Sequence, residues 1–135
     1  QHMNSGGLVP NEIVNEVFQL KLQQYNSTDW IVSDGFPRSV EQADWLDQLL
    51  NQEFRHIDEV ILLEITDDEA RTRLSKRTRT DDLNTIVDQR MEVYNTQTKT
   101  VVDHYENAGL LKRVDGMGTV EQVYGRLCEA FGVSV

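Results

Sequence analysis

Cationic side chains concentrate in one short stretch of this otherwise acidic chain. Arg71, Arg73, Lys76, Arg77 and Arg79 place five cations within nine residues, whereas the whole sequence has a net charge of −10. The guanidinium group of arginine presents paired donors that match phosphate or carboxylate oxygens. Arg73 and Arg77 are four residues apart and share one face of a helix. The pattern favours local binding of an anion such as a polyphosphate, although an ordinary solvated helix face fits the same spacing.

A second group of polar residues follows a short apolar run. Trp30, Ile31 and Val32 lead into the segment Ser33-Asp34-Gly35-Phe36-Pro37-Arg38. If the run is a strand that ends near Asp34, a carboxylate and then a guanidinium lie at the ligand-facing end of a sheet. In a phosphotransferase, such an aspartate orders water around magnesium and the arginine binds phosphate. An Asp-Gly turn followed by a surface arginine is the open alternative.

A further charged cluster, Arg79-Thr80-Asp81-Asp82, leads into a helix that carries Arg90 two turns later. Several guanidinium groups that converge on one polyphosphate would supply the positioning and charge stabilisation that phosphoryl transfer requires. An ion-pair network among the same arginines and aspartates fits these residues equally well. The sequence alone leaves both interpretations open.

The elements that must position these residues follow from hydrophobic periodicity and capping signals. Helical spacing is continuous from 83 to 108, with a bend expected around Thr98, and Gly109 ends this helix. Short apolar runs bounded by turn residues predict strands. The predicted helices are 11–25, 39–52, 66–76, 83–108 and 119–131, and the predicted strands are 30–34, 60–65 and 110–114.

Alternation of strands and helices predicts an α/β fold with a parallel sheet covered on both faces. The nearly continuous apolar run 60–65 is typical of a strand buried on both faces. Asp34, the 71–79 cluster and Gly116 to Gly118 all follow predicted strands. We therefore expect these three segments to meet at the carboxyl edge of the sheet, where ligands bind.

Composition narrows the class of protein. The 135 residues suit one domain, and no apolar run approaches the roughly 20 residues that cross a bilayer. The excess of acidic residues, 23 against 13 basic, argues against a general nucleic-acid-binding or anionic-membrane surface. We expect a cytoplasmic protein without nucleic-acid or membrane partners.

Metal-binding residues give little signal. His2, His56 and His104 have no evident metal-ligand partners, and Cys128 is the only cysteine. One cysteine forms neither a disulfide nor a cysteine-based zinc site within a chain. Cys128 falls in a helical pattern, and we expect it in the core.

Taken together, five segments of the sequence resemble successive motifs of adenylate kinases. Asp34-Gly35-Phe36-Pro37-Arg38 with Gln42-Ala43 is the most specific of them. The resemblance runs from about Met3 to the C-terminus. The other segments are Leu8-Val9-Pro10-Asn11-Glu12-Ile13-Val14, Arg73-Leu74-Ser75-Lys76-Arg77, Arg79-Thr80-Asp81-Asp82 with Arg90, and Val114-Asp115-Gly116.

The resemblance implies reversible phosphoryl transfer, ATP plus AMP giving two ADP, with magnesium. It implies that Arg38 binds the AMP phosphate, that Gln42 binds the adenine edge, and that Asp34 orders water around the metal. Val9, Val14 and the Gly35 backbone would complete the AMP site. Arg73 would stack on the ATP adenine near the backbone of Met117 and Gly118, and Arg77, Arg79 and Arg90 would hold the phosphates.

The resemblance also implies a P-loop-kinase-like, three-layer α/β/α fold that is incomplete, because no Gly-x-x-Gly-x-Gly-Lys loop occurs in the sequence and its strand is absent. The first arginine of the monophosphate region is missing, and Thr98-Lys99-Thr100 lacks the proline often found there. Residues 1–135 would form a single incomplete domain. About 3–25 would be the remainder of the monophosphate-binding region, and 26–135 the core, with a very short lid near 77–80.

Loss of the phosphate loop leads us to expect no meaningful kinase activity from this chain alone. A truncated kinase, a non-catalytic nucleotide- or partner-binding module, and one half of a split kinase are the alternatives. In the family architecture the P-loop strand separates strands 30–34 and 60–65, so its absence leaves unpaired backbone groups. We expect those two strands to pair directly, or the chain to form a strand-exchanged homodimer.

Overall fold

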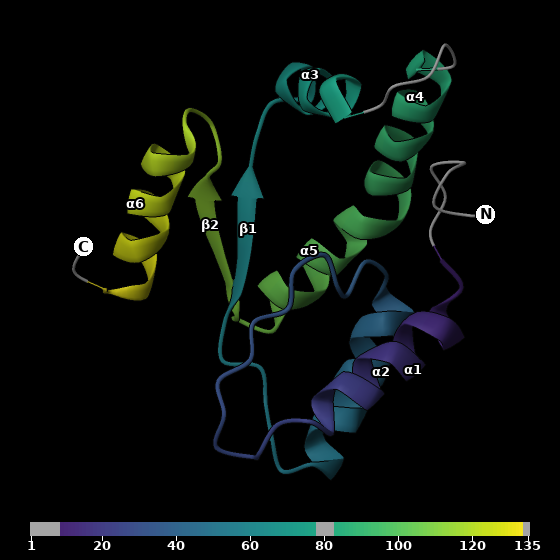
Figure 1. Cartoon of the computed structure of the whole chain (residues 1–135), viewed down its shortest axis with the longest axis vertical. Helices are drawn as coiled ribbons and strands as arrows, with labels where there is room; N and C mark the ends of the chain where they lie inside the picture. The colour runs from purple at the N-terminus through teal and green to yellow at the C-terminus, as the bar shows by residue number, and fades with distance from the viewer. Residues whose placement is uncertain (1–8, 78–82, 134–135) are drawn as a thin grey trace.

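The computed structural model describes residues 9–77 and 83–133 and contains helices on both sides of a small sheet. Strands β1 (Val60–Glu64) and β2 (Leu111–Asp115) lie at the centre of Figure 1. Helix α6 (Val120–Phe131) lies on one side of them and α5 (Lys99–Asn107) on the other. The predicted α/β/α arrangement with a parallel sheet is confirmed.

The sheet is built from two parallel strands in continuous register. Val60 pairs with Leu111 and Glu64 with Asp115. The apolar run forms the predicted strand, but the expectation that it is buried on both faces is wrong: Val60 to Leu62 are half-buried and Leu63 is 46% exposed. The ladder continues beyond β1, where the Gly116 N–H donates to the Glu64 carbonyl at 2.8 Å. A parallel pair requires a crossover, and here the crossover consists of the helices between residues 67 and 107.

Two further helices form a pair beside the sheet, at the lower right of Figure 1. They are α1 (Asn11–Leu22) and α2 (Val40–Gln52), and both match predicted helices, although α1 ends three residues earlier than predicted. The Ser39 hydroxyl caps α2 by accepting from the Gln42 N–H at 3.2 Å. Ser39 and Gln42 have the spacing of a capping box, but the Gln42 side chain accepts from the Arg38 N–H and not from the Ser39 N–H, so the box is only half formed.

The crossover begins with α3 (Asp67–Arg77) and continues as one long arm. The arm consists of α4 (Leu83–Val93), a π-helical turn η1 (Tyr94–Thr98) and α5. The predicted bend near Thr98 is therefore real, and its physical form is a π-turn, a feature that inserts an extra residue into a helix and is frequent at functional sites.

The core lies where α2, α5 and the sheet meet. Ala43, Val101 and Tyr105 form its buried centre, with Val60 and Leu111 packed against them. Cys128 is buried on α6, as the helical pattern predicts. In the described part of the chain, no helix is long and apolar enough to span a membrane.

The prediction of a strand at 30–34 is wrong. Residues 30–34 have no regular secondary structure, and the Trp30 and Val32 side chains are 85% and 93% exposed. The guanidinium of Arg55 instead donates to the carbonyl groups of Tyr25, Asn26 and Asp29, which holds the preceding turn against the end of α2. An apolar run becomes a strand only with a hydrogen-bonded neighbour, and local propensity does not replace one.

Direct pairing of 30–34 with 60–65 is wrong for the same reason. Within residues 9–77 and 83–133, β1 pairs with β2 alone. The strand-exchanged homodimer, the other expected response, remains a prediction.

Candidate functional site

The first part of the candidate site is the loop between the exposed 30–34 segment and α2. Gly35 has a φ of 76°, and a Cβ atom there would lie 2.8 Å from Nη2 of Arg38. The Arg38 Nε donates to the Gly35 carbonyl at 2.7 Å. Glycine is favoured at this position because of its positive φ, whereas the exposed guanidinium could shift away from a Cβ atom.

Gln42 is buried beneath this loop and uses both ends of its amide. Gln42 is 2% exposed, and its Oε1 accepts from the Arg38 backbone N–H at 2.7 Å. Its Nε2 donates to Oδ1 of Asn11, at the start of α1, at 2.8 Å. A buried amide with both groups paired is rigid, because loss of either partner leaves a costly unsatisfied group. Gln42 thus joins α1, α2 and the Arg38 main chain.

The Arg38 carbonyl is held from the opposite side by the long arm. Thr98, in the π-turn, donates its hydroxyl to the Arg38 carbonyl at 3.2 Å across 60 residues of sequence. The main chain of Arg38 is therefore fixed at both its N–H and its C=O. The exposed side chain remains bound only to the carbonyl of its own loop.

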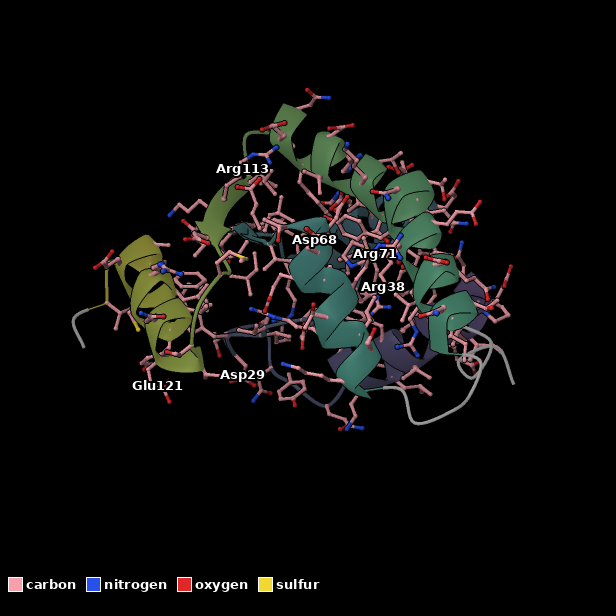
Figure 2. The ribbon with its side chains drawn as sticks, turned by 90° about the horizontal axis from the view of Figure 1, so that it is seen from above. Asp29, Arg38, Asp68, Arg71, Arg113 and Glu121 are labelled. Carbon is pink, nitrogen blue, oxygen red and sulfur yellow. The ribbon has the colours of Figure 1, made fainter. Side chains whose placement is uncertain are left out.

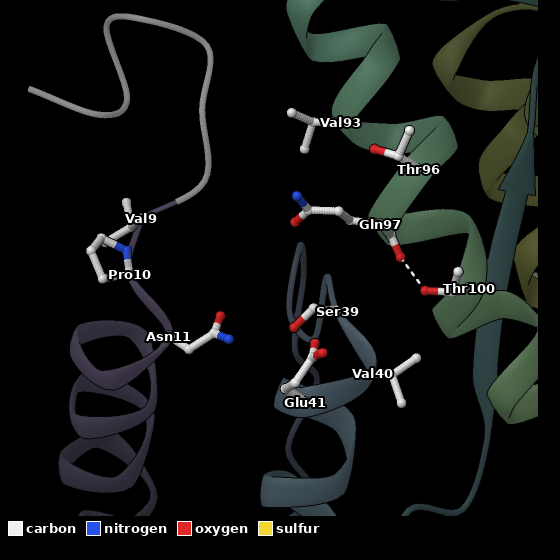
Figure 3. Close-up of a pocket in the computed structure, with 10 residues that line it drawn as sticks. All are labelled: Val9, Pro10, Asn11, Ser39, Val40, Glu41, Val93, Thr96, Gln97 and Thr100. Atoms are coloured by element: carbon white, nitrogen blue, oxygen red, sulfur yellow. Dashed lines mark hydrogen bonds between the residues drawn. The ribbon is translucent and has the colours of Figure 1, made fainter.

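A cavity of about 850 Å³ opens beside this loop, between the N-terminal ends of α1 and α2 and the π-turn. Figure 3 shows its three walls. Val9 is the one predicted AMP-site residue among its lining residues; Val14, Gly35, Arg38 and Gln42 lie outside the lining. The cavity is lined by Val9, Pro10, Asn11, Ser39, Val40, Glu41, Val93, Thr96, Gln97 and Thr100.

The second part of the candidate site joins α3 to the turn after β2. Nε of Arg73 donates to Oε1 of Glu69 at 2.7 Å, and Nη2 of Arg73 donates to the Gly116 carbonyl at 3.1 Å. Gly116 precedes Met117 and Gly118, so the structure brings together the three positions predicted for the ATP adenine. Gly118 has a φ of 99°, and a Cβ atom there would lie only 2.3 Å from Oε1 of Gln122.

An ion pair between α3 and α4 accounts for another cation of the 71–79 cluster. Arg71 donates to Oδ1 of Asp88, and this hydrogen bond raises the pKa of Arg71 above its ordinary value. Part of the cluster therefore joins two helices, a role that neither anion binding nor a solvated helix face predicts. In Figure 2, which looks down on the carboxyl ends of the strands, Arg71 lies on the side of α3 that faces α4.

The remaining predicted phosphate-binding residues are only partly placed. Arg90 is half-buried on α4, and Arg77 is the last residue of α3. Arg79 and the side chain of Arg77 lie outside the described residues, as do Asp81 and Asp82, so the predicted phosphate clamp and the alternative ion-pair network stay predictions.

Asp34 lies in an exposed bend next to Gly35, not at the end of a strand. Among the described residues, no three His, Cys, Asp or Glu side chains gather as metal ligands. His56 contacts Asp58 at 3.0 Å, and His104 lies 3.6 Å from Asp47. An exposed carboxylate is a suitable oxygen donor for magnesium, which usually keeps several waters and takes few protein ligands.

Sequence reasoning missed three residues that hold the candidate site. They are Asn11, which binds Gln42; Thr98, which binds Arg38; and Arg126, whose Nη1 donates to the Met117 carbonyl at 2.6 Å. Asn11 lies within the 8–14 segment that resembles adenylate kinases, and its position at the start of a predicted helix is the only sequence feature that singles it out. Nothing in the local sequence of Thr98 indicates a bond to a segment 60 residues away, and nothing in that of Arg126 indicates its bond to the turn before α6.

Comparison with known proteins gives one consistent result. The family model described as adenylate kinase matches residues 1–110. An adenylate kinase of Prochlorococcus marinus is 41% identical over 128 residues, which is 95% of this chain and 69% of that protein. An adenylate kinase of Thermus thermophilus is 37% identical over 97% of this chain and 70% of its own length, and one of Nocardia farcinica is 33% identical over 98% and 72%. With the loop at Arg38, the buried Gln42 and the Arg73 contact to Gly116 in place, this chain belongs to the adenylate kinase family.

Proposed function

We propose that this chain carries the monophosphate site and part of the ATP site of an adenylate kinase, whose reaction is ATP plus AMP giving two ADP. The observation that carries the proposal is the construction of the Arg38 loop. Its main chain is fixed by a buried glutamine and by the π-turn, whereas its guanidinium is exposed. A fixed main chain with an exposed guanidinium suits the binding of a small phosphate.

In this proposal Arg38 binds the AMP phosphate and Gln42 binds the adenine edge. The Gly35 backbone, Val9 and Val14 complete the AMP site. The Gln42 amide already accepts from the Arg38 N–H and donates to Asn11. Its Nε2 carries a second N–H, which in this proposal donates to the base.

For the second nucleotide, Arg73 would stack on the adenine, and its hydrogen bonds to Glu69 and the Gly116 carbonyl support this role because they hold it beside the turn that contains Met117 and Gly118. The backbone of Met117 and Gly118 borders the same place. Arg77, Arg79 and Arg90 would hold the phosphates at a very short lid near 77–80. Asp34 would hold the waters of a magnesium ion, which in this chemistry neutralises the charge of the transferred phosphate.

The domain assignment follows from these roles. Residues about 3–25 belong to the monophosphate-binding region, and 26–135 to the core. The 135 residues contain no glycine-rich phosphate loop, and transfer depends almost entirely on positioning and charge stabilisation. We therefore expect the isolated chain to be inactive. A coupled assay with ATP, AMP and magnesium should show no turnover above background, and a rate in the usual range of roughly 1–10³ per second would contradict the expectation.

The binding proposal is tested by calorimetry with AMP and with ATP. We expect tighter binding of AMP, and we expect Arg38→Ala to weaken it by about tenfold or more, since a charge-assisted hydrogen bond contributes about 1.5–3 kcal/mol. Arg113→Ala is the matched control, because Arg113 is an exposed arginine paired with Glu64 and Glu106. Tighter binding of ATP, or equal losses in the two variants, would contradict the site assignment.

A second candidate function, one half of a two-chain kinase, is favoured by exposed apolar side chains. Leu63 on β1 is 46% exposed, and Trp30 and Val32 are 85% and 93% exposed. A partner segment that brings a strand and a phosphate loop would cover them, whereas a non-catalytic binding module has no such need. Mixing the chain with the part of the Thermus thermophilus adenylate kinase that it does not match should then restore turnover. Binding without turnover would favour the module.

A further inference from the structure

Three threonines in and just after the π-turn have hydroxyl groups that make different kinds of bond. Thr96 donates to the Glu92 carbonyl at 2.8 Å, and Thr100 donates to the Gln97 carbonyl. Both bonds stay within the arm and are the ordinary way in which a helical threonine satisfies its hydroxyl. Thr98, between them, reaches the Arg38 carbonyl instead. This bond satisfies no group of the arm's own backbone. Its effect is on the loop that contains Arg38.

The Thr98 bond completes a set of contacts around the Arg38 main chain. On one side the Arg38 N–H donates to the Gln42 amide, which Asn11 holds in turn. On the other side the Thr98 hydroxyl donates to the Arg38 carbonyl. Contacts from α1, α2 and the π-turn thus fix the direction in which the Arg38 side chain leaves the backbone. The guanidinium itself has an exposed bond to the Gly35 carbonyl, which an anion in solution can replace.

We propose that Thr98 is a positioning residue for the monophosphate arginine: through the Arg38 carbonyl, it sets the geometry with which Arg38 receives the phosphate of the nucleotide. This inference rests on the proposed role of Arg38. It assigns a function to the π-turn, because the turn places one hydroxyl toward the loop while its neighbours remain bonded to the arm. It also predicts that Thr98 affects the phosphate and not the base or sugar.

The test uses the whole 135-residue chain with Thr98→Val, which removes the hydroxyl and keeps the branched shape. We expect 5′-AMP to bind about fivefold more weakly, the effect of one net hydrogen bond, while adenosine, which lacks the phosphate, binds as before. Thr98→Ser should restore AMP affinity. The matched control is Thr72→Val, which removes a hydroxyl that donates to the Asp68 carbonyl on α3. An equal loss for adenosine, or an unchanged affinity for AMP, would overturn the inference.

A second measurement separates this inference from the proposed function. If the unmodified chain binds no AMP, the function proposal fails, but amide hydrogen exchange still decides the role of Thr98. The Arg38 N–H should exchange about fivefold faster in Thr98→Val, because the loop opens more easily, and at an unchanged rate in Thr72→Val. Unchanged exchange at Arg38 in Thr98→Val would show that the hydroxyl does not hold the loop.

Discussion

At the residue scale, Tyr105 is the largest fully buried side chain in the described part of the molecule. It is 1% exposed, and its ring contacts His104 edge to face at 5.0 Å between centroids. Its hydroxyl has no hydrogen-bond partner among the described residues. A buried donor without a partner loses its hydration and gains nothing in exchange.

We therefore predict that Tyr105→Phe stabilises the chain by about 1 kcal/mol, because it removes the unsatisfied hydroxyl and keeps the ring. Urea unfolding measures this change. Val101→Ala, which leaves a cavity at a neighbouring buried position, is the contrasting variant and should destabilise. A loss of stability in Tyr105→Phe would show that the hydroxyl has a partner in solution.

The same residue predicts a dependence of stability on pH. Burial raises the pKa of Tyr105 above its ordinary value, and the carboxylates of Asp47 and Asp44 raise it further. The folded state then keeps the phenol proton at a pH where the unfolded chain has lost it. The free energy of unfolding should be unaffected by this group below about pH 10 and should fall as pH rises above it. In Tyr105→Phe the free energy of unfolding should fall less steeply with pH above about pH 10. The same dependence on pH in both proteins would show that Tyr105 does not cause it.

At the element scale, α6 begins with a complete capping box. The Thr119 hydroxyl accepts from the Gln122 N–H at 3.3 Å, and the Gln122 side chain accepts from the Thr119 N–H at 2.9 Å. The end of the same helix is closed by Gly132 with a φ of 67°. Hydrogen bonds from its own backbone N–H and from Thr119 lower the pKa of Glu121 in the first turn.

We predict that Thr119→Ala lowers the free energy of unfolding by about 1 kcal/mol, since the Gln122 N–H at the helix start loses its hydroxyl acceptor. Thr119→Ser retains the hydroxyl and serves as the matched control. Thermal and urea unfolding measure both. Equal stability of the alanine and serine variants would show that the box contributes nothing to the fold.

At the scale of the whole molecule, the outer edge of β1 has no strand beside it in the described residues. β1 pairs with β2 along one edge only, and its sequence is apolar enough for a central strand. Leu63 on this strand is 46% exposed. An apolar strand with an unpaired edge is a template for another chain.

We predict concentration-dependent association of the chain, which Leu63→Lys should weaken because a charge on an edge strand opposes further pairing. Sedimentation velocity over a range of concentrations measures this effect. Phe54→Lys is the matched control, because Phe54 is 97% exposed but lies in the turn after α2. Equal reduction by both variants would assign association to general hydrophobicity, and a monomer at every concentration would exclude a strand-exchanged dimer.

The sequence by itself predicted every helix, strands β1 and β2, and the resemblance to adenylate kinases. Those features depend on local information: apolar periodicity, capping residues and turn residues act within a few positions of one another. The motif around Arg38 and Gln42 was visible for the same reason. The bend of the long arm was also predicted at Thr98, although its π-turn form was not.

Only the tertiary structure decided that residues 30–34 form no strand and which contacts hold the candidate site. A strand needs backbone hydrogen bonds to a neighbouring strand, and the apolar run that begins at Trp30 has none in the described residues, so it has no regular structure. Arg55 binds the turn that precedes it. The contacts of Thr98 with Arg38 and of Asn11 with Gln42 join residues 60 and 31 positions apart. Such bonds depend on where whole helices pack, and helix packing is a property of the assembled fold that no local pattern encodes.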